Sequence, residues 1–327
     1  MRNFSYVRAN SPTEASHAAQ QAGAMILAGG TTLLDLAKCG VTEPETVIDI
    51  VNLAGMSGIT VDAAGATIGA LARMSEVADH KDIRAAFPAV SESLSLAASA
   101  QLRNMATIGG NLLQRTRCSY FRDPGAFPAC NKRSPGSGCS AIGGVTRNHA
   151  VLGTSEACIA SYPGDLAVAL IAFDAVVETG SRKIAIGDFF LLPGDTPNKE
   201  TILQRGEIIT AIAIPASVAA RNSTYIKVRD RQSYEFAAAS AAVGLELEAD
   251  GRTIRDIRVA LGGVATKPWR ARAVEQVLIG KALAAETVEK ASRLAMEGAV
   301  DHGGNSYKIE LAPRVVARAI LQMGGLA

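Results

Sequence analysis

Five cysteines are the residues of this chain best suited to hold a metal or form a cross-link. Four of them, Cys118, Cys130, Cys139 and Cys158, lie in one window, where uniform scatter would place about 0.6 of a cysteine. Their spacing, C-x11-C-x8-C-x18-C, lacks the C-x2-C pair typical of zinc ribbons and fingers. The fifth, Cys39, lies far away in the sequence. The clustering therefore needs a cause other than a zinc finger.

On spacing alone, three interpretations of the four clustered cysteines stay open. Four thiolates could hold an iron–sulfur cluster, whose negative charge the nearby cations would offset. Two disulfides would need an oxidising compartment and would leave Cys39 unpaired. Four buried thiols without any site are the third interpretation. His149 could replace one cysteine as a ligand, but we expect it at the surface. The cations of this segment are Arg115, Arg117, Arg122, Lys132 and Arg133.

Two glycine pairs, in ILAGGTTLLDL and ATIGGNLLQ, could bind an anion. Glycines let the backbone turn so that successive N–H groups point at one phosphate. Two such loops could share the pyrophosphate of a dinucleotide, whereas the ordinary interpretation of Gly-Gly is a tight turn. The Rossmann pattern G-x-G-x-x-G and the P-loop pattern are both absent, so a dinucleotide would be held in another way.

No other residues form a recognisable catalytic pattern, and we assign no catalytic residue to this chain. The other histidines, His17, His80 and His302, have no metal-like or triad-like spacing. Neither H-E-x-x-H nor G-x-S-x-G occurs. The run KVRDR, followed by Tyr234, is by default a solvated strand end. In a dinucleotide protein it could supply cations and an aromatic ring near the cofactor.

Composition excludes several classes of protein. The 327 residues are 48% apolar and 20% charged, which is ordinary for folded domains and excludes wholesale disorder. Lys and Arg number 33 against 31 Asp and Glu, so we expect neither nucleic acid nor an anionic membrane as a partner. No apolar stretch approaches the roughly 18 to 20 residues that a membrane span needs. Polar residues follow the start, so we expect no export signal on this chain.

The elements that must position the first glycine pair alternate between helix and strand. Ser11-Pro12-Thr13-Glu14 predicts a helix start, and Gly23 predicts its end. A strand over 24–28 leads into the glycine pair, followed by a helix ending at Gly40 and a strand over 46–50. This opening predicts an α+β or α/β module.

The later sequence predicts two further regions. The middle mixes strands over 66–71, 174–179 and 208–214 with helices over 74–80 and 85–99, and 114–144 reads as a long functional loop. After Pro215, strands over 223–229 and 236–265 turn at Asp250-Gly251. Helices are predicted over 271–280, 283–299 and 311–323. A separate C-terminal domain should therefore begin near residue 220.

The segments AGGTTLLDL, QLRNMATIGGNLLQ, PGDLAVAL and KVRDRQSYEFA, in that order, resemble the FAD-binding medium subunit of the xanthine dehydrogenase family of molybdenum hydroxylases. The resemblance covers essentially the whole chain. The run LLQRTRCSYFRD…CNKRSPGSGC…GTSEACIA resembles a subgroup with an additional [4Fe-4S] cluster, found in bacterial periplasmic aldehyde oxidoreductase and 4-hydroxybenzoyl-CoA reductase. Most of the family lacks this cysteine loop.

The resemblance implies an α+β fold. Residues 1–220 would form a two-subdomain FAD-binding domain of the vanillyl-alcohol oxidase (PCMH) type, with an inserted [4Fe-4S] loop at about 114–158. Residues 221–327 would form a C-terminal domain of antiparallel sheet plus helices, like that of the CO dehydrogenase flavoprotein.

The resemblance also implies site residues. The first glycine loop would wrap the FAD pyrophosphate, Thr107 to Asn111 would form a second phosphate loop, and Asp165 would lie near the adenosine part. Lys227 and Tyr234 would lie towards the isoalloxazine. Gly164 stands where many relatives have Ser, which removes a hydroxyl contact. The implied FAD residues are Ile26, Leu27, Ala28, Gly29, Gly30, Thr31, Thr32, Leu33, Leu34, Thr107, Gly109, Gly110, Asn111, Asp165, Lys227 and Tyr234. The implied cluster ligands are Cys118, Cys130, Cys139 and Cys158.

The resemblance finally implies a function. The chain would be the electron-transfer subunit of a heterotrimeric aldehyde oxidoreductase, inactive on substrate alone. It would pass electrons from a molybdopterin-binding large subunit and a two-[2Fe-2S] small subunit to an external acceptor. It would be cytoplasmic, or periplasmic if a partner carries the export signal. Alternatives are a subunit acting on heterocycles or an aryl-CoA, a standalone flavin/iron–sulfur electron carrier, and a self-sufficient flavoenzyme.

Overall fold

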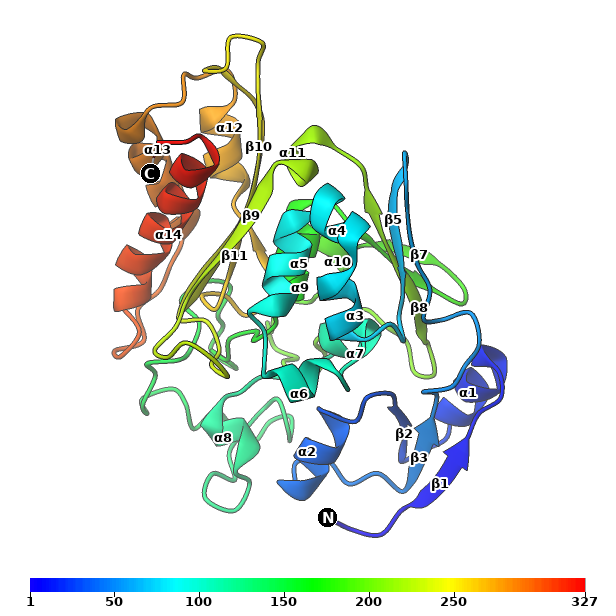
Figure 1. The fold of residues 1–327 in the computed structure, drawn as a ribbon. Helices are drawn as coiled ribbons and strands as arrows, with labels where there is room; N and C mark the ends of the chain where they lie inside the picture. The colour runs from blue at the N-terminus through cyan, green and yellow to red at the C-terminus, as the bar shows by residue number, and fades with distance from the viewer. Residues whose placement is uncertain (327) are drawn as a thin grey trace.

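Three β-sheets and the helices packed on them form the described part of the chain (Figure 1). The structure, a computed structural model, describes residues 1–326. The first sheet is parallel, with strand order β1-β3-β2, and the helices α1 and α2 follow β1 and β2. Its elements are β1 (Ser5–Arg8), α1 (Pro12–Ala19), β2 (Ala24–Leu27), α2 (Leu33–Lys38) and β3 (Thr46–Asp49).

Local signals account for most of this first module. The Ser11 hydroxyl accepts a hydrogen bond from the backbone N–H of Glu14, and Pro12 opens α1 at a position where its missing N–H costs nothing. Gly23, with φ of +69°, turns the chain into β2. Only β1 was not predicted. Its side chains are all exposed, so no alternation of buried and exposed residues marks it as a strand.

The second sheet is antiparallel, with strand order β4-β5-β8-β6-β7. Its strands are β4 (Ile59–Asp62), β5 (Gly65–Gly69), β6 (Val176–Thr179), β7 (Lys183–Ala185) and β8 (Ile209–Pro215). A layer of helices lies beside it, in which α4, α7 and α10 contact its strands and every residue of α9 is buried. These helices are α3 (Met74–Asp79), α4 (Lys81–Ala86), α5 (Pro88–Ser95), α6 (Ala100–Arg103), α7 (Ile108–Leu112), α9 (Leu166–Ala172) and α10 (Ile186–Phe189).

The single helix predicted over 85–99 is wrong, because the chain breaks at Phe87. Pro88 occupies the first position of α5, and a proline disfavours helical geometry in the residue before it. Phe87 accordingly has φ −142° and ψ 61°. The result is two short helices, α4 and α5, in place of one long helix.

The third sheet, with strand order β12-β11-β10-β9, lies between two helical layers (Figure 1). On one face, α5, α9 and α11 pack against small residues. A Cβ at Gly244 would lie 2.4 Å from the Ala219 carbonyl oxygen, and one at Gly262 would lie 2.6 Å from a Val168 methyl. On the other face, α12 and α14 pack over a second core. The elements are α11 (Val218–Arg221), β9 (Ser223–Val228), β10 (Ala239–Leu247), β11 (Ile254–Gly262), β12 (Trp269–Arg270), α12 (Arg272–Leu278), α13 (Ala285–Ser292), the 3-10 helix η1 (Arg293–Met296) and α14 (Tyr307–Met323).

The last helix begins earlier than the predicted residue 311. Asn305 and Lys308 are almost fully buried at its start. The Lys308 ammonium donates to the Gly263 carbonyl at 2.6 Å, and the Asn305 amide donates to the Ala150 carbonyl at 2.9 Å. These long-range contacts stabilise the extra turn, and Pro313 consequently lies inside the helix.

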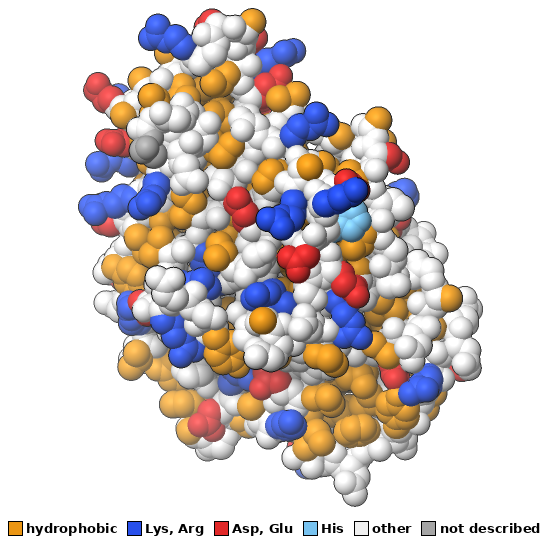
Figure 2. All heavy atoms as spheres, in the orientation of Figure 1, with side chains coloured by type: hydrophobic (Ala, Val, Ile, Leu, Met, Phe, Trp, Pro, Cys, Tyr) orange, Lys and Arg blue, Asp and Glu red, His pale blue; other side chains and the backbone are white. Residues whose placement is uncertain are grey.

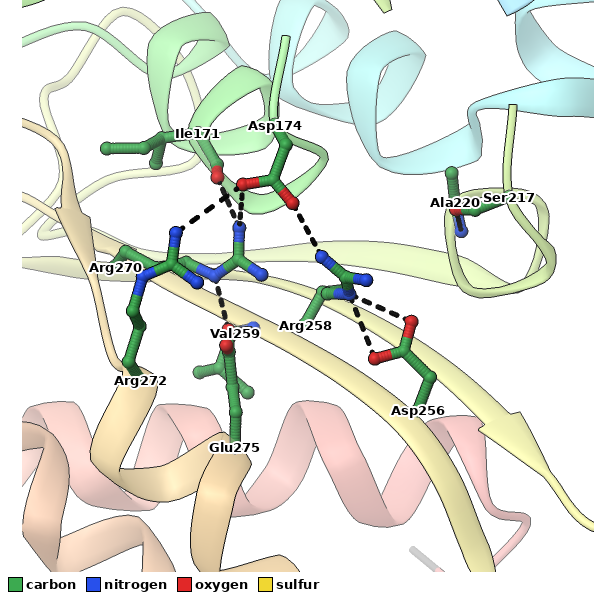
Figure 3. Close-up of polar contacts among 10 residues, drawn as sticks. All are labelled: Ile171, Asp174, Ser217, Ala220, Asp256, Arg258, Val259, Arg270, Arg272 and Glu275. Atoms are coloured by element: carbon green, nitrogen blue, oxygen red, sulfur yellow. Dashed lines mark hydrogen bonds and ion pairs between the residues drawn. The ribbon is translucent and has the colours of Figure 1, made fainter. Parts of the chain in front are cut away.

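A group of ion pairs joins the end of α9 to the third sheet (Figure 3). Asp174 lies between Arg258, Arg270 and Arg272. Arg270 is nearly buried and also pairs with Glu275, whose carboxylate accepts the Val259 N–H at 2.7 Å. The arginines thus tie the N-terminal part of the chain to the C-terminal sheet and to α12.

The segment from Leu113 to Asp165 contains only one short helix, α8 (Ser119–Arg122), and it includes the stretch 114–144 that was predicted to be a loop. It packs against α2, where Phe121 and Leu36 share a small buried cluster with Cys130. Within residues 1–326, no helix combines the length and the apolar character needed to cross a membrane.

Candidate functional site

A cleft of about 410 Å³ brings the two glycine pairs together. The loop between β2 and α2 forms one wall, and the start of α7 forms another. A third wall comes from residues 205–209, directly before and at the start of β8. In Figure 2, hydrophobic side chains gather in the lower right of the molecule, where Figure 1 places β2, β3 and α7. The cleft therefore combines an apolar lining with two glycine loops.

The first glycine loop needs glycine at both of its Gly-Gly positions. A Cβ at Gly29 would lie 2.1 Å from the Met105 carbonyl oxygen, so only glycine fits there. Gly30 has φ of +73°, the left-handed conformation that glycine adopts without strain. Within residues 1–326, no hydrogen bond uses the backbone N–H groups of residues 29–33. These five residues line the cleft, so the loop offers it unused donors.

The second glycine loop opens α7. The Thr107 hydroxyl caps the helix by accepting the Gly110 N–H at 3.4 Å. A Cβ at Gly109 would lie 2.9 Å from that of Ala70, so this glycine allows close packing. At Gly110 a Cβ would meet only the Thr107 hydroxyl, at 3.0 Å, and otherwise open space. Gly109 thus serves the fold, whereas Gly110 leaves the cleft open.

Two buried polar atoms at these loops lack partners among the described residues. They are the Asn111 side-chain oxygen and the Thr42 hydroxyl, and Thr42 lines the cleft. Buried polar groups are normally hydrogen-bonded, so such orphans suit a polar ligand. The Thr42 hydroxyl can donate to a ligand in the cleft, and with the unused N–H groups it fits a phosphate-bearing cofactor such as FAD. The Asn111 oxygen can only accept a hydrogen bond, and Asn111 does not line the cleft, so it adds no donor for a phosphate.

The structure brings most of the predicted loop residues to the cleft, and adds others. Ile26, Thr107 and residues 28–33 line it, whereas Leu27 and Leu34 support the turn at Gly30 from behind. Thr42, Arg115 and the whole 205–209 wall also line the cleft, and none of them was predicted as a cleft residue. Of these, only Gly206 gives a local signal, a turn.

Asp165 and Lys227 do not line this cleft. They form a nearly buried ion pair, in which Lys227 Nζ lies 2.7 Å from Asp165 Oδ2. The Tyr225 hydroxyl donates to the same carboxylate at 2.6 Å. Burial raises the pKa of Asp165, and the Lys227 ammonium opposes that rise. Tyr234 is exposed, in the loop between β9 and β10, with the Arg231 guanidinium over its ring.

The four clustered cysteines lie in one region and are free thiols, while Cys39 is exposed. Cys130 and Cys139 pair in an isolated antiparallel bridge. Cys118 packs against one small apolar cluster that contains Cys130, and it packs with Cys139 against another. Burial raises the pKa of Cys158, and its neighbours Cys139 and Cys130 raise it further. The sequence window therefore corresponds to a spatial cluster.

Hydrogen bonds hold the two central cysteines together. The Asn131 N–H donates to the Gly138 carbonyl at 2.6 Å, and the Cys130 N–H donates to the Ser137 hydroxyl at 3.0 Å. Arg133 donates to the carbonyls of Tyr120 and Phe121 at 3.0 and 2.7 Å. A single arginine therefore fixes the segment that follows Cys118.

Of the five cations around the cysteines, four share two carboxylates. Arg115 and Lys132 pair with Glu200, and Arg117 and Arg122 pair with Asp35. Arg133 has only backbone carbonyls as partners. The surroundings of the cysteines are therefore positively charged, as an anionic group would require.

His149 is buried, so the expectation of a surface position is wrong. Its Nε2 lies 3.2 Å from Cys118 Sγ. Burial lowers the pKa of His149 to about 4, and burial raises that of Cys118 to about 12. Neither group therefore carries a charge at neutral pH unless a cation is added to the site. Among the described residues, no three His, Cys, Asp or Glu side chains are grouped as ligands of a single metal ion.

Comparisons with known proteins identify the family. A family model described as the FAD binding domain in molybdopterin dehydrogenase matches residues 2–217. The chain belongs to the FAD-binding medium subunits of the molybdenum hydroxylases. A second model, the CO dehydrogenase flavoprotein C-terminal domain, matches residues 223–323.

Relatives match along nearly the whole chain. The aldehyde oxidoreductase FAD-binding subunit PaoB of Escherichia coli is 44% identical over 98% of both chains. The glyceraldehyde dehydrogenase medium chain of Sulfolobus acidocaldarius is 28% identical, again over 98% of both. A chain of carbon monoxide dehydrogenase from Hydrogenophaga pseudoflava superimposes with a TM-score of 0.76 at 25% identity, covering 100% of this chain and 99% of its own. These matches confirm the predicted fold class, an α+β FAD-binding domain followed by an antiparallel sheet with helices.

Proposed function

We propose that this chain is the FAD- and [4Fe-4S]-binding electron-transfer subunit of a molybdenum-containing aldehyde oxidoreductase. The 44% identity to the Escherichia coli aldehyde oxidoreductase subunit, over 98% of both chains, supports an aldehyde as the substrate of the complex. The main observation in favour of the [4Fe-4S] cluster is that four cysteines gather in one cationic loop. They are Cys118, Cys130, Cys139 and Cys158.

The proposed FAD site is the cleft between the two glycine loops. Residues 29–33 would donate their unused N–H groups to the pyrophosphate, and the apolar lining would cover the uncharged parts of the cofactor. The open side of Gly110 would let the phosphates approach the backbone. Bound FAD supplies electron chemistry, while the protein supplies binding and orientation.

The proposed cluster site consists of the four cysteines. Burial keeps Cys118 protonated in the absence of metal, because a buried thiolate without a counter-charge is unfavourable. Binding iron would therefore release protons and order the loop, as metal sites generally couple to folding. In a [4Fe-4S] cluster each of the four thiolates binds a different iron atom of a cube. The four cysteines therefore do not need to converge on a single ion. Two disulfides are disfavoured because all four thiols are free.

We further propose that the chain divides near residue 220 and works with two partner chains. One would be a molybdopterin-binding large subunit and the other a small subunit with two [2Fe-2S] clusters. We assign no catalytic residue to this chain, so the aldehyde would be oxidised on the large subunit. Electrons would leave through this chain to an external acceptor.

Co-expression with the two candidate partner genes tests the proposal. We expect a 1:1:1 complex that oxidises aldehydes, and a chain that is inactive when purified alone. A stable monomer that reduces its own FAD with aldehyde would contradict the subunit assignment.

A further inference from the structure

His149 makes one side-chain hydrogen-bond contact among the described residues, and that contact is to a cysteine proposed as a cluster ligand. Its Nε2 lies 3.2 Å from Cys118 Sγ. Its other ring nitrogen, Nδ1, is buried and has no partner. Only 4% of the residue is exposed. The imidazole is thus directed at sulfur.

The C-terminal domain holds this histidine in place. The Asn305 amide donates to the carbonyl of Ala150 at 2.9 Å and to that of His149 at 3.4 Å. The His149 N–H donates to the Thr146 carbonyl at 2.8 Å, and the Thr146 hydroxyl accepts the Gly304 N–H at 2.8 Å. A segment more than 150 residues away therefore fixes the ring beside the cysteine loop.

A thiolate has no hydrogen to donate, so in the cluster-bound state the hydrogen must lie on His149 Nε2. We propose that His149 is a positioning residue whose Nε2–H donates to the Cys118 thiolate and thereby raises the reduction potential of the cluster. This inference rests on the proposed function, because it requires the [4Fe-4S] cluster.

The direction of the effect follows from charge. One-electron reduction adds a negative charge to the cluster and its thiolates, while the imidazole keeps its proton. A hydrogen bond to a ligand sulfur stabilises the more negative, reduced state, and such bonds are among the factors that set cluster potentials. Burial of the imidazole strengthens the bond, because the local dielectric is low.

Three variants of the purified complex test the proposal. His149→Leu removes the donor, and His149→Gln keeps an N–H donor on a side chain of similar reach. His302→Gln is the matched control, because His302 Nε2 contacts the Thr154 hydroxyl at 3.2 Å and no sulfur. The potential is measured by anaerobic titration with dithionite, followed by low-temperature EPR, together with iron per complex.

We expect His149→Leu to lower the equilibrium constant for cluster reduction about tenfold, which is about 59 mV for a one-electron couple. His149→Gln should restore most of the loss, and His302→Gln should leave the midpoint unchanged. A wild-type midpoint in an iron-loaded His149→Leu complex would overturn the inference but leave the cluster intact. A wild-type complex without the cluster would overturn the proposed function and this inference together.

If His149→Leu fails to fold, spectroscopy of the wild-type complex still tests whether His149 donates a hydrogen bond to the Cys118 sulfur. Labelling with ¹⁵N-histidine and pulsed EPR of the reduced cluster should show a weak nitrogen coupling and an exchangeable proton. The labelled-nitrogen coupling should be absent in His149→Gln, whereas the exchangeable proton should persist there, because the amide N–H replaces the imidazole donor. The absence of both signals from the wild-type spectrum, or a nitrogen coupling large enough for direct iron ligation, would overturn the inference.

Discussion

Lys227 Nζ lies 2.7 Å from Asp165 Oδ2, and both side chains are almost fully buried. Asp165 directly precedes α9, and Lys227 lies on β9, so the pair joins the FAD-binding part of the chain to the third sheet. The Lys227 ammonium also donates to the Leu96 carbonyl at 3.1 Å. This geometry indicates a structural tie, whereas the family resemblance implied contacts to the cofactor.

Lys227→Met should cost about 3–5 kcal/mol of unfolding free energy, because it leaves the Asp165 carboxylate buried without its cation. The double variant Lys227→Met/Asp165→Asn should recover a large part of this loss, since the Tyr225 hydroxyl can still donate to the amide oxygen. Urea denaturation measures both. The control is Lys183→Met, because the Lys183 side chain is mostly exposed where it pairs with Glu178, and the pair should contribute less than about 1 kcal/mol. If Lys227→Met instead lost FAD while its unfolding free energy stayed unchanged, Lys227 would be a cofactor-binding residue and not a structural one.

Gly110→Val should abolish FAD binding while leaving the fold stable, because the new side chain enters the cleft and meets little of the protein. The measurement is FAD absorbance per chain, combined with the thermal midpoint of the apoprotein. Gly187→Val is the matched control, since Gly187 is exposed, lies in the short helix α10 and would place its new Cβ more than 4 Å from any neighbouring atom. Full FAD occupancy in Gly110→Val would contradict the loop assignment.

Arg133→Lys should loosen the cysteine loop, because lysine cannot reproduce a planar fork that donates to several carbonyls. We expect a loss of about 2 kcal/mol in local stability and faster proteolysis within 120–128. Limited proteolysis with mass spectrometry identifies the cleavage site. Arg221→Lys, at the C-terminal end of α11, provides a control on an unrelated segment. Equal cleavage rates in both variants would show that Arg133 does not anchor the loop.

Glu207 should make the cleft wall sensitive to acid. Hydrogen bonds from Arg182, with further ones from Gln204 and Thr179, lower the pKa of Glu207 from 4.5 to about 2. A carboxylate with a lowered pKa stabilises the fold above pH 4.5, and this contribution disappears as the pH falls towards 2. Because Arg182 is partly exposed, we expect this ion pair to contribute about 1 kcal/mol to the unfolding free energy.

Glu207→Gln should therefore show a smaller drop in unfolding free energy than the wild type between pH 5 and pH 3. Denaturant titrations at both values measure this. Parallel pH profiles for the two proteins would contradict the assigned ion pair.

Local signals in the sequence predicted the elements that local chemistry determines. Ser11 and Glu14 marked the start of α1, and Gly251 marked the hairpin between β10 and β11. The break at Phe87 could also have been predicted, because Pro88 follows it. The strand β1 could not, since it pairs through its backbone and buries none of its side chains.

Long-range contacts determined the parts of the site that the sequence did not predict. His149 is buried by residues near Asn305, which are far away in the chain. The 205–209 wall reaches the cleft only because β8 pairs with β5 and β6. The spacing of the cysteines in the sequence allowed three interpretations, because it does not show which cysteines meet. The fold places Cys158 near Cys139.

Iron content tests the central claim most directly, because the partner subunits contribute the same iron to every variant complex. Cys118→Ser, Cys130→Ser, Cys139→Ser and Cys158→Ser complexes should each contain about four fewer irons than the anaerobically purified wild type. Cys39→Ser should match the wild type, because its thiol is exposed and lies apart from the other four in sequence. Unchanged iron in the four variants would contradict a [4Fe-4S] cluster on this chain.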